Sequence, residues 1–296
     1  MGGEFSHRCA VVLMNYQNPE ALVTTEWLAD NLGRDDVVVF DGTSHLPTTG
    51  RNGNAEFLEK HIPGALRFDI DDIADPDTSL SHMLPGAELF AAKLSQLGVR
   101  NSDHVIVYDV YGLQSAARAW WMMRIFGHDN VSLLSGGLPQ WEAEGRATEA
   151  GTQARPASTF SATLRPALVR DINALLTNVT TDAEQVADAR AAGRFTGADP
   201  EPRAGMRSGH IPNSHSLPFT TLLDGNRIFL DGDQLKSIIE GAGIQLDKPL
   251  VATCGSGVTA CVIAFACHLI GKSDVAIYDG SWSEWGARQD TPVASD

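Results

Sequence analysis

A cysteine followed by a glycine-rich turn occurs near the C-terminal end of the chain, in the sequence Cys254-Gly-Ser-Gly-Val-Thr259. Two glycines let the backbone curl tightly, so that successive N–H groups can point toward one centre and hold an anion. A thiol in such a cradle is expected to ionise readily, and the thiolate is the nucleophilic form of cysteine. The turn therefore predicts nucleophilic chemistry at Cys254. The residues predicted to bind the substrate from this turn are Gly255, Gly257, Val258 and Thr259.

A plainer interpretation of Cys254 is a small buried apolar side chain, which is a common role of a free cysteine. Its place between an apolar strand and an apolar helix, within a glycine-rich turn, favours the reactive interpretation. Cys261 and Cys267 lie inside the apolar segment that follows the turn. For these two residues we predict packing alone.

Two arginines, Arg194 and Arg203, stand in a segment that contains two prolines and two glycines, Gly193-Arg-Phe-Thr-Gly-Ala-Asp-Pro-Glu-Pro-Arg203. This composition predicts a structured loop rather than a helix. Guanidinium groups match the geometry of carboxylates, so two converging arginines could hold an α-keto acid. The alternative is a pair of exposed arginines on an acidic surface. For the neighbouring Arg190 and Arg207 we predict structural roles.

The elements that must position these residues are short β-branched runs that alternate with segments of helical period. This alternation is typical of βαβ units and a parallel sheet. Gly271 follows the last helical segment, where a glycine suits a left-handed C-terminal cap. The predicted strands are 37–40, 105–108, 250–253 and 275–278, and the predicted helices are 115–126 and 258–270.

The second half of the chain repeats the first. His61-Ile-Pro-Gly64 returns as His210-Ile-Pro-Asn213, and Ser135-Gly-Gly-Leu-Pro-Gln-Trp141 returns as Asp279-Gly-Ser-Trp-Ser-Glu-Trp285, at nearly the same spacing. Ordered matches of this kind indicate a tandem duplication. We predict an N-terminal domain over 1–150, a polar linker over 151–165 and a C-terminal domain over 166–296. Asp109 then aligns with Cys254.

The segment Cys254-Gly-Ser-Gly-Val-Thr-Ala260 resembles the active-site loop of the tandem-rhodanese sulfurtransferases, in particular those that use 3-mercaptopyruvate. The resemblance covers nearly the whole chain. It implies an α/β fold of two tandem rhodanese-like domains, each a small parallel sheet flanked by helices. Further matching motifs are His61-Ile-Pro-Gly-Ala65, Trp120-Trp121, Gly193-Arg-Phe-Thr-Gly197, Pro200-Glu-Pro-Arg203, Gly209-His-Ile-Pro212 and Asp279-Gly-Ser-Trp282.

The resemblance also implies a reaction. Sulfur would pass from 3-mercaptopyruvate to a thiol acceptor such as thioredoxin, or to cyanide, through a persulfide on Cys254, with release of pyruvate. Asp109 cannot carry sulfur, so only the second domain would be catalytic, and the edge of the first would help to close the cleft. In the family, the positions of Arg194 and Arg203 form the substrate clamp.

The departing pyruvate enolate needs a proton, and Ser256 is the nearest candidate donor or relay. By resemblance, His61 of the first domain would act with Ser256 across the interface. An aspartate is expected shortly before this histidine, where the chain has Asn52. A histidine in His-Ile-Pro could equally brace its loop, as His210 would in the second copy.

Composition narrows the class of partner. The 296 residues carry 22 Lys and Arg against 37 Asp and Glu, a net charge of −15, without a basic run that could neutralise nucleic-acid phosphates. No apolar stretch approaches the ~20 residues that span a bilayer. Four cysteines without an even framework indicate a reducing compartment. We therefore expect a cytoplasmic protein that binds neither nucleic acid nor membrane. The resemblance implies a monomer, because tandem rhodaneses are large enough to act alone, and the implied reaction needs no metal or organic cofactor.

Three other functions stay open. Thiosulfate could be the donor, but rhodaneses that prefer it usually carry basic residues where this chain has Gly255 and Ser256. A cysteine phosphatase of the same fold would need an arginine that closes the loop, and Ala260 stands at that position. A non-enzymatic sulfur carrier would need the cysteine but would have no use for the two arginines.

Overall fold

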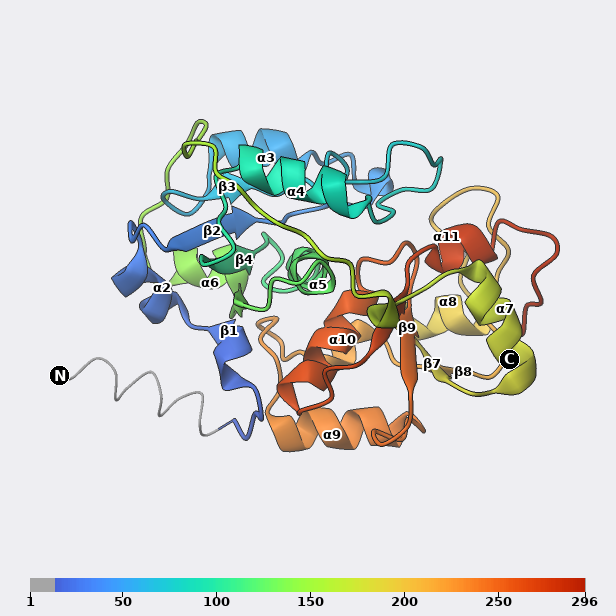
Figure 1. Cartoon of the computed structure of the whole chain (residues 1–296). Helices are drawn as coiled ribbons and strands as arrows, with labels where there is room; N and C mark the ends of the chain where they lie inside the picture. Colours follow the sequence, from blue (N-terminus) through green and yellow to red (C-terminus); the bar gives the residue numbers. More distant parts are fainter. Residues whose placement is uncertain (1–13, 296) are drawn as a thin grey trace.

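Each half of the chain forms one five-stranded parallel sheet in the computed structural model, which describes residues 14–295 (Figure 1). The strand order is β1-β5-β4-β2-β3 in the first sheet and β6-β10-β9-β7-β8 in the second, so the second order is the first shifted by five strands. This repetition confirms the predicted duplication and the α/β fold of two domains. The strands are β1 (Leu22–Val23), β2 (Val37–Asp41), β3 (Leu66–Arg67), β4 (His104–Tyr108), β5 (Val131–Leu134), β6 (Val169–Arg170), β7 (Gln185–Asp188), β8 (Ser214–Ser216), β9 (Leu250–Thr253) and β10 (Ala276–Tyr278).

Helices flank both sheets. In the first half they are α2 (Thr25–Asn31), α3 (Gly53–Glu59), α4 (Ala87–Gln96), α5 (Ala116–Ile125) and α6 (Gly137–Ala143). In the second half they are α7 (Ile172–Thr181), α8 (Ala192–Thr196), α9 (Gly232–Gly241), α10 (Ala260–Leu269) and α11 (Ser281–Trp285). Short 3-10 helices cover Pro19–Ala21, Pro47–Thr49, Pro166–Leu168 and Phe219–Leu222. No helix among residues 14–295 is long and apolar enough to cross a membrane.

The predicted strands and helices are confirmed to within two residues at each end. Gly271 has the left-handed φ of 94° that was expected after α10. One local prediction is wrong, because Arg194 lies in the short helix α8 rather than in a loop. Gly197, at φ 85°, ends this helix, so the two prolines that favoured a loop both come after it.

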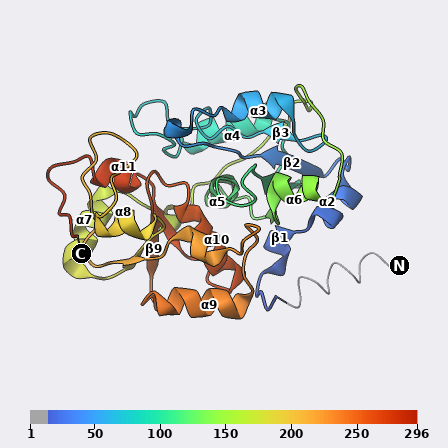
Figure 2. The ribbon, with the colours of Figure 1, turned by 180° about the vertical axis from the view of Figure 1, so that it is seen from behind.

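The two halves meet along α5 and α10, which lie side by side between the sheets in both views (Figures 1 and 2). The rings of Trp120 and Phe265 cross edge to face across this contact, with centroids 4.7 Å apart. One cluster of buried apolar side chains runs through both halves. The contact therefore fixes the carboxyl edge of the second sheet against residues of the first domain.

Candidate active site

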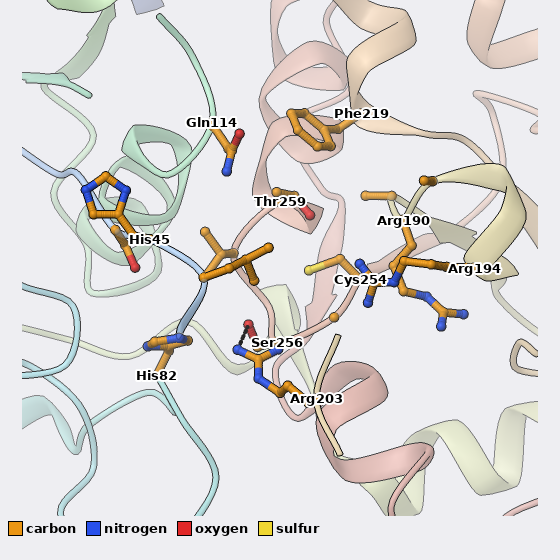
Figure 3. Close-up of a pocket in the computed structure, with 16 residues that line it drawn as sticks. His45, His82, Gln114, Arg190, Arg194, Arg203, Phe219, Cys254, Ser256 and Thr259 are labelled. Carbon is orange, nitrogen blue, oxygen red and sulfur yellow. Dashed lines mark hydrogen bonds between the residues drawn. The ribbon is translucent and has the colours of Figure 1, made fainter. Parts of the chain in front are cut away.

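Cys254 follows β9 directly, at the carboxyl edge of the second sheet, where α/β folds commonly bind ligands. Its side chain is almost fully buried, with 2 % of its surface exposed, and it lines a cavity of about 240 Å³ (Figure 3). Cys261 and Cys267 in α10 are fully buried, and burial raises the pKa of the Cys267 thiol to about 12. Among the described cysteines, Cys254 is the one that faces the cavity.

The turn after Cys254 forms the predicted cradle of N–H groups. The carbonyls of Cys254 and Gly255 accept hydrogen bonds from the N–H groups of Trp282 and Ser283, at 3.0 and 2.8 Å. Because a trans peptide is planar, its N–H points away from a carbonyl that is turned outward. Within residues 14–295, the N–H groups of 255–259 donate to no backbone or side-chain oxygen. These donors are therefore available to an anion at the thiol.

The corresponding turn of the first domain holds its own anion. The carboxylate of Asp109 accepts hydrogen bonds from the N–H groups of Tyr111, Gln114 and Ala116, at 2.9, 2.8 and 2.8 Å. The same fold thus collects N–H donors around a negative charge in both copies. In the first copy the Asp109 carboxylate accepts from these donors, whereas in the second copy no side chain among the described residues does so.

Arg194 and Arg203 converge on the Cys254 turn, as predicted from their chemistry. A Cβ atom added to Gly255 would lie 3.2 Å from Nη2 of Arg194 and 3.6 Å from Nη1 of Arg203. Nη2 of Arg203 also donates to Oγ of Ser256 at 3.2 Å. The absence of a side chain at Gly255 therefore lets both guanidinium groups approach the nucleophile.

An ionic network that was not predicted from the sequence holds Arg194. Glu201 binds Nη2 of Arg194 at 2.5 Å and Nη1 of Arg190 at 2.6 Å, and Arg190 pairs with Asp188 at 2.7 Å. Arg190 is buried and also packs on the ring of Trp282, 4.2 Å from its centroid. Glu201 thus holds the guanidinium groups of Arg190 and Arg194 in one orientation. The sequence offered no signal for its role beyond its position between two prolines.

His61, predicted to act in proton transfer, does not line the cavity. Its Nδ1 donates to the carbonyl of Phe57 at 2.7 Å, and its ring stacks on that of Phe57 with centroids 4.1 Å apart. His210 makes the same contacts with Phe195, at 2.8 Å and 3.8 Å. The His-Ile-Pro motif therefore braces its loop in both domains.

A different histidine of the first domain, His82, lines the same cavity as Ser256 (Figure 3). Its Nδ1 lies 2.6 Å from Oδ1 of Asp71, and this contact lowers the pKa of the Asp71 carboxyl. His82 has a φ of 65°, an uncommon conformation for a residue other than glycine that is often found at functional sites. Asn52, where an aspartate was expected, caps α3 instead.

The rest of the first-domain wall comes from the segments after β2 and β4. Ser44, His45 and Gln114 line the cavity, and Tyr111 holds Nδ1 of His45 at 2.6 Å. Gln114 and Phe219, from different domains, both point toward the cavity (Figure 3). These wall residues were not predicted individually, because the sequence does not reveal which loops of the first domain meet the second.

The part of the chain that the structure describes contains no group of three or more His, Cys, Asp or Glu side chains arranged to hold a metal ion. The charges at the cavity are instead those of three arginines, Arg190, Arg194 and Arg203. Such a site suits a small anionic substrate despite the negative charge of the whole chain.

Comparisons with known proteins agree with this arrangement. A family model described as a rhodanese-like domain matches residues 24–144 and 171–288. The chain is 43 % identical to the Arabidopsis thaliana protein named thiosulfate/3-mercaptopyruvate sulfurtransferase 1, mitochondrial, over 93 % of this chain and 78 % of that protein. It is 43 % identical to Homo sapiens 3-mercaptopyruvate sulfurtransferase, over 90 % of this chain and 92 % of that protein.

Solved structures share the fold. The Escherichia coli protein SseA, described as a 3-mercaptopyruvate sulfotransferase with the rhodanese fold, superimposes with a TM-score of 0.81 and 38 % identity, over 89 % of this chain and 99 % of that one. Both domains of the present chain therefore have counterparts in a solved structure.

Proposed function

The chain belongs to the rhodanese-like family, and on this premise we propose that it is a sulfurtransferase that uses 3-mercaptopyruvate as its sulfur donor. The observation that carries the proposal is the Cys254 thiol at a turn of five available N–H groups, beside two converging arginines. A nucleophile, an anion cradle and a carboxylate clamp are the parts that this reaction needs.

The clamp sets the orientation of the donor. The carboxylate and carbonyl oxygens of 3-mercaptopyruvate bind the guanidinium groups of Arg194 and Arg203, and its sulfur then lies at Cys254. The Cys254 thiolate attacks this sulfur and forms a new S–S bond. The C–S bond breaks, and its electron pair leaves on the carbon as the enolate of pyruvate.

Proton delivery completes the first half of the reaction. The enolate carbon takes one proton and becomes pyruvate, and we assign this transfer to Ser256 with His82. The contact of His82 with Asp71 supports this role because it fixes the orientation of the imidazole. His61 is the weaker candidate because it does not line the cavity, its Nδ1 donates to a carbonyl, and its Nε2 faces Glu149 at 3.4 Å.

The second half discharges the persulfide. An acceptor thiolate attacks the outer sulfur, and the S–S bond breaks with its electrons on Cys254, which returns as the thiolate. The N–H groups of residues 255–259 stabilise the negative charge of the outer sulfur between the two halves. No metal or organic cofactor enters either step.

Three alternative functions are less well supported. Thiosulfate has a compact charged head, and the loop beside Cys254 offers the uncharged Gly255 and Ser256 in place of basic side chains. A sulfur carrier would not need a clamp built by Glu201 and two arginines. Phosphate hydrolysis lacks its arginine, because Ala260 begins α10 where that side chain would be required.

The acceptor, compartment and assembly belong to the same proposal. The cavity of about 240 Å³ is smaller than the roughly 300–1,000 Å³ that encloses a drug-sized ligand. A protein acceptor such as thioredoxin would therefore present one projecting cysteine. The free thiols of Cys254, Cys261 and Cys267 favour a reducing compartment such as the cytoplasm. We propose a monomer, since each domain has its partner within the chain.

Intact-protein mass spectrometry tests the proposal. The reduced protein is incubated with 3-mercaptopyruvate or, in parallel, with thiosulfate, and the Cys254→Ser variant serves as the control. A gain of one sulfur atom from 3-mercaptopyruvate that the variant lacks, and that is weaker from thiosulfate, is expected. No added sulfur from either donor would refute the sulfurtransferase proposal.

A further inference from the structure

The first domain places a fully buried arginine behind the Cys254 turn. Arg118 lies in the first turn of α5, the helix that packs on α10 of the second domain, and no part of its side chain is exposed. Removing a guanidinium group from water is costly unless its charge and its N–H groups are compensated. The groups that contact Arg118 therefore show which parts of the site this charge positions.

Three polar groups, from both domains, contact the two terminal nitrogens of Arg118, while its Nε has no hydrogen-bond partner among the described residues. Its Nη1 lies 2.7 Å from Oδ1 of Asp279 and donates to the carbonyl of Gly257 at 3.1 Å, and its Nη2 donates to the carbonyl of His82. The guanidinium group also lies 4.6 Å from the ring centroid of Trp121. One side chain thus joins the turn after Cys254 to the backbone of the histidine that we assign to proton delivery.

The contact of Arg118 with Gly257 sets the direction of the next N–H group in the turn. A carbonyl that points at Arg118 turns the N–H of Val258 the opposite way, because both belong to one planar peptide. A cation at the carbonyl also polarises the peptide, so its N–H becomes a stronger donor. Gly257 has a φ of 74°, and a Cβ there would lie 3.0 Å from Nη1, so glycine permits this approach.

We propose that Arg118 is a positioning residue for sulfur transfer, through which the first domain sets the fraction of Cys254 that is thiolate. It aligns and strengthens the N–H of Val258 and adds positive charge behind the turn, which Asp279 partly offsets. The reaction is the one proposed above, so this inference rests on that function. The first domain, which has Asp109 at the position of Cys254, would thus contribute to the reaction through Arg118.

Other charged and titratable groups also face Cys254. Their side chains are unchanged in the Arg118 variants, so the control variants below are needed to assign a change in thiolate fraction to Arg118. These groups are His82 from the first domain, Arg190, Arg194 and Arg203 around the cavity, and Asp279 and Cys261 behind the turn.

The test measures the rate of Cys254 alkylation by iodoacetamide as a function of pH, with the site of reaction checked by mass spectrometry. In Arg118→Met we expect the midpoint of this profile to move about one unit to higher pH, which is about tenfold less thiolate below the midpoint. Persulfide formation from 3-mercaptopyruvate at neutral pH should slow by about the same factor. Arg118→Lys should recover part of both losses.

Arg124→Met is the matched control. Arg124 lies on the same helix and packs on Trp120, 4.9 Å from its ring centroid, but it faces Asp129 rather than the turn. Its replacement should leave the alkylation midpoint unchanged. Asp279→Asn removes the offsetting charge and should move the midpoint to lower pH, opposite to Arg118→Met.

Two results would overturn the inference. One is an Arg118→Met midpoint equal to that of the wild type, and the other is a shift of Arg118→Met and Asp279→Asn in the same direction, which would indicate a loosened interface. Persulfide formation tests the proposed function, and the alkylation profile tests the role of Arg118. Failure of the wild type to form a persulfide refutes the proposed function, whereas the alkylation profile still measures the effect of Arg118.

Discussion

At the scale of the residue, the position that ends the central strand distinguishes the two turns, because it is Asp109 in the first copy and Cys254 in the second. Asp109 and Cys254 each follow a central strand and precede a glycine-containing turn, and each lies where the turn can collect N–H groups. A carboxylate saturates these donors, whereas a thiol leaves them for a bound sulfur. The chemistry of the whole chain therefore depends on which residue ends the strand.

Replacing Asp109 tests the structural half of this comparison. Asp109→Ala leaves three N–H groups, those of Tyr111, Gln114 and Ala116, without an acceptor. An unpaired buried donor costs about 1–3 kcal/mol, and of the three bonds the one from Ala116 is fully buried, so the free energy of unfolding in urea should fall by about 1–3 kcal/mol. Asp109→Asn, which keeps one carbonyl oxygen, should lose less. Equal stability of Asp109→Ala and the wild type would contradict the filled cradle.

The clamp predicts an effect on substrate affinity. Arg203→Gln removes a charge-assisted hydrogen bond to the donor carboxylate, so the KM for 3-mercaptopyruvate should rise about 10- to 100-fold in steady-state assays of pyruvate release. Arg207→Gln is the control, because Arg207 binds the carbonyls of Trp285 and Thr291 outside the cavity. An unchanged KM in Arg203→Gln would remove Arg203 from the clamp.

The two histidines of the first domain predict different losses. His82→Gln should lower kcat for pyruvate release about tenfold or more with little change in thermal stability, because proton transfer by a positioned group contributes about 10²–10⁴-fold. His61→Gln should lower the thermal midpoint and leave kcat near that of the wild type, because its ring packs on Phe57. The reverse pattern would restore the relay to His61.

At the scale of the element, the sequence was most informative where one property repeats along a short segment. Apolar runs predicted β9 and α10 closely, and Gly271 marked the end of α10. The helix around Arg194 was missed because prolines beyond Gly197 were counted against it. Composition averaged over a segment therefore fails where a five-residue helix ends within that segment.

The parts of the site that were predictable lie on one loop, as the Cys254 turn does, or combine a suitable chemistry with a motif, as Arg194 and Arg203 do. Cys254 and the N–H groups after it are consecutive, so the sequence displays them together. The pairing of His82 with Asp71, and of Glu201 with Arg194, depends on how loops close in space. The His-Ile-Pro motif does not reveal where its histidine points, and in the structure His61 and His210 each stack on a phenylalanine that precedes it in the sequence. The contacts between the two domains could not be predicted from the sequence for the same reason.

At the scale of the whole molecule, the two domains are held together at more than one place. Beyond α5 and α10, the first described residues of the chain bind the second domain, where the N–H of Gln17 donates to the carbonyl of Leu269 at 2.7 Å. The hydroxyl of Tyr16 donates to the carbonyl of Leu230 at 2.9 Å. A cavity lined from both domains is thereby given a fixed shape.

Buried histidines make this assembly sensitive to acid. Burial lowers the pKa of His104 and of His268 to about 4, and His268 lies against Trp120 at the domain contact. Unfolded histidine takes up its proton near pH 6.5, so between pH 6.5 and 4 the unfolded chain binds more protons and stability falls as the pH falls.

Urea unfolding at pH 7 and pH 5 measures this loss. We expect about 1 kcal/mol for each of the two histidines, a value that allows for their partial contact with solvent. His268→Gln should be less sensitive to the change of pH than the wild type. A wild-type midpoint that is equal or higher at pH 5 would contradict the assigned direction.

The most direct test of the account is the stoichiometry of the first half-reaction without an acceptor. The protein and 3-mercaptopyruvate are mixed in equal amounts, and pyruvate and the Cys254 persulfide are quantified together. A double displacement predicts one pyruvate and one persulfide per chain, with further pyruvate only when a thiol and more donor are added. Pyruvate that appears only after the thiol is added, with no persulfide before it, would contradict transfer through Cys254.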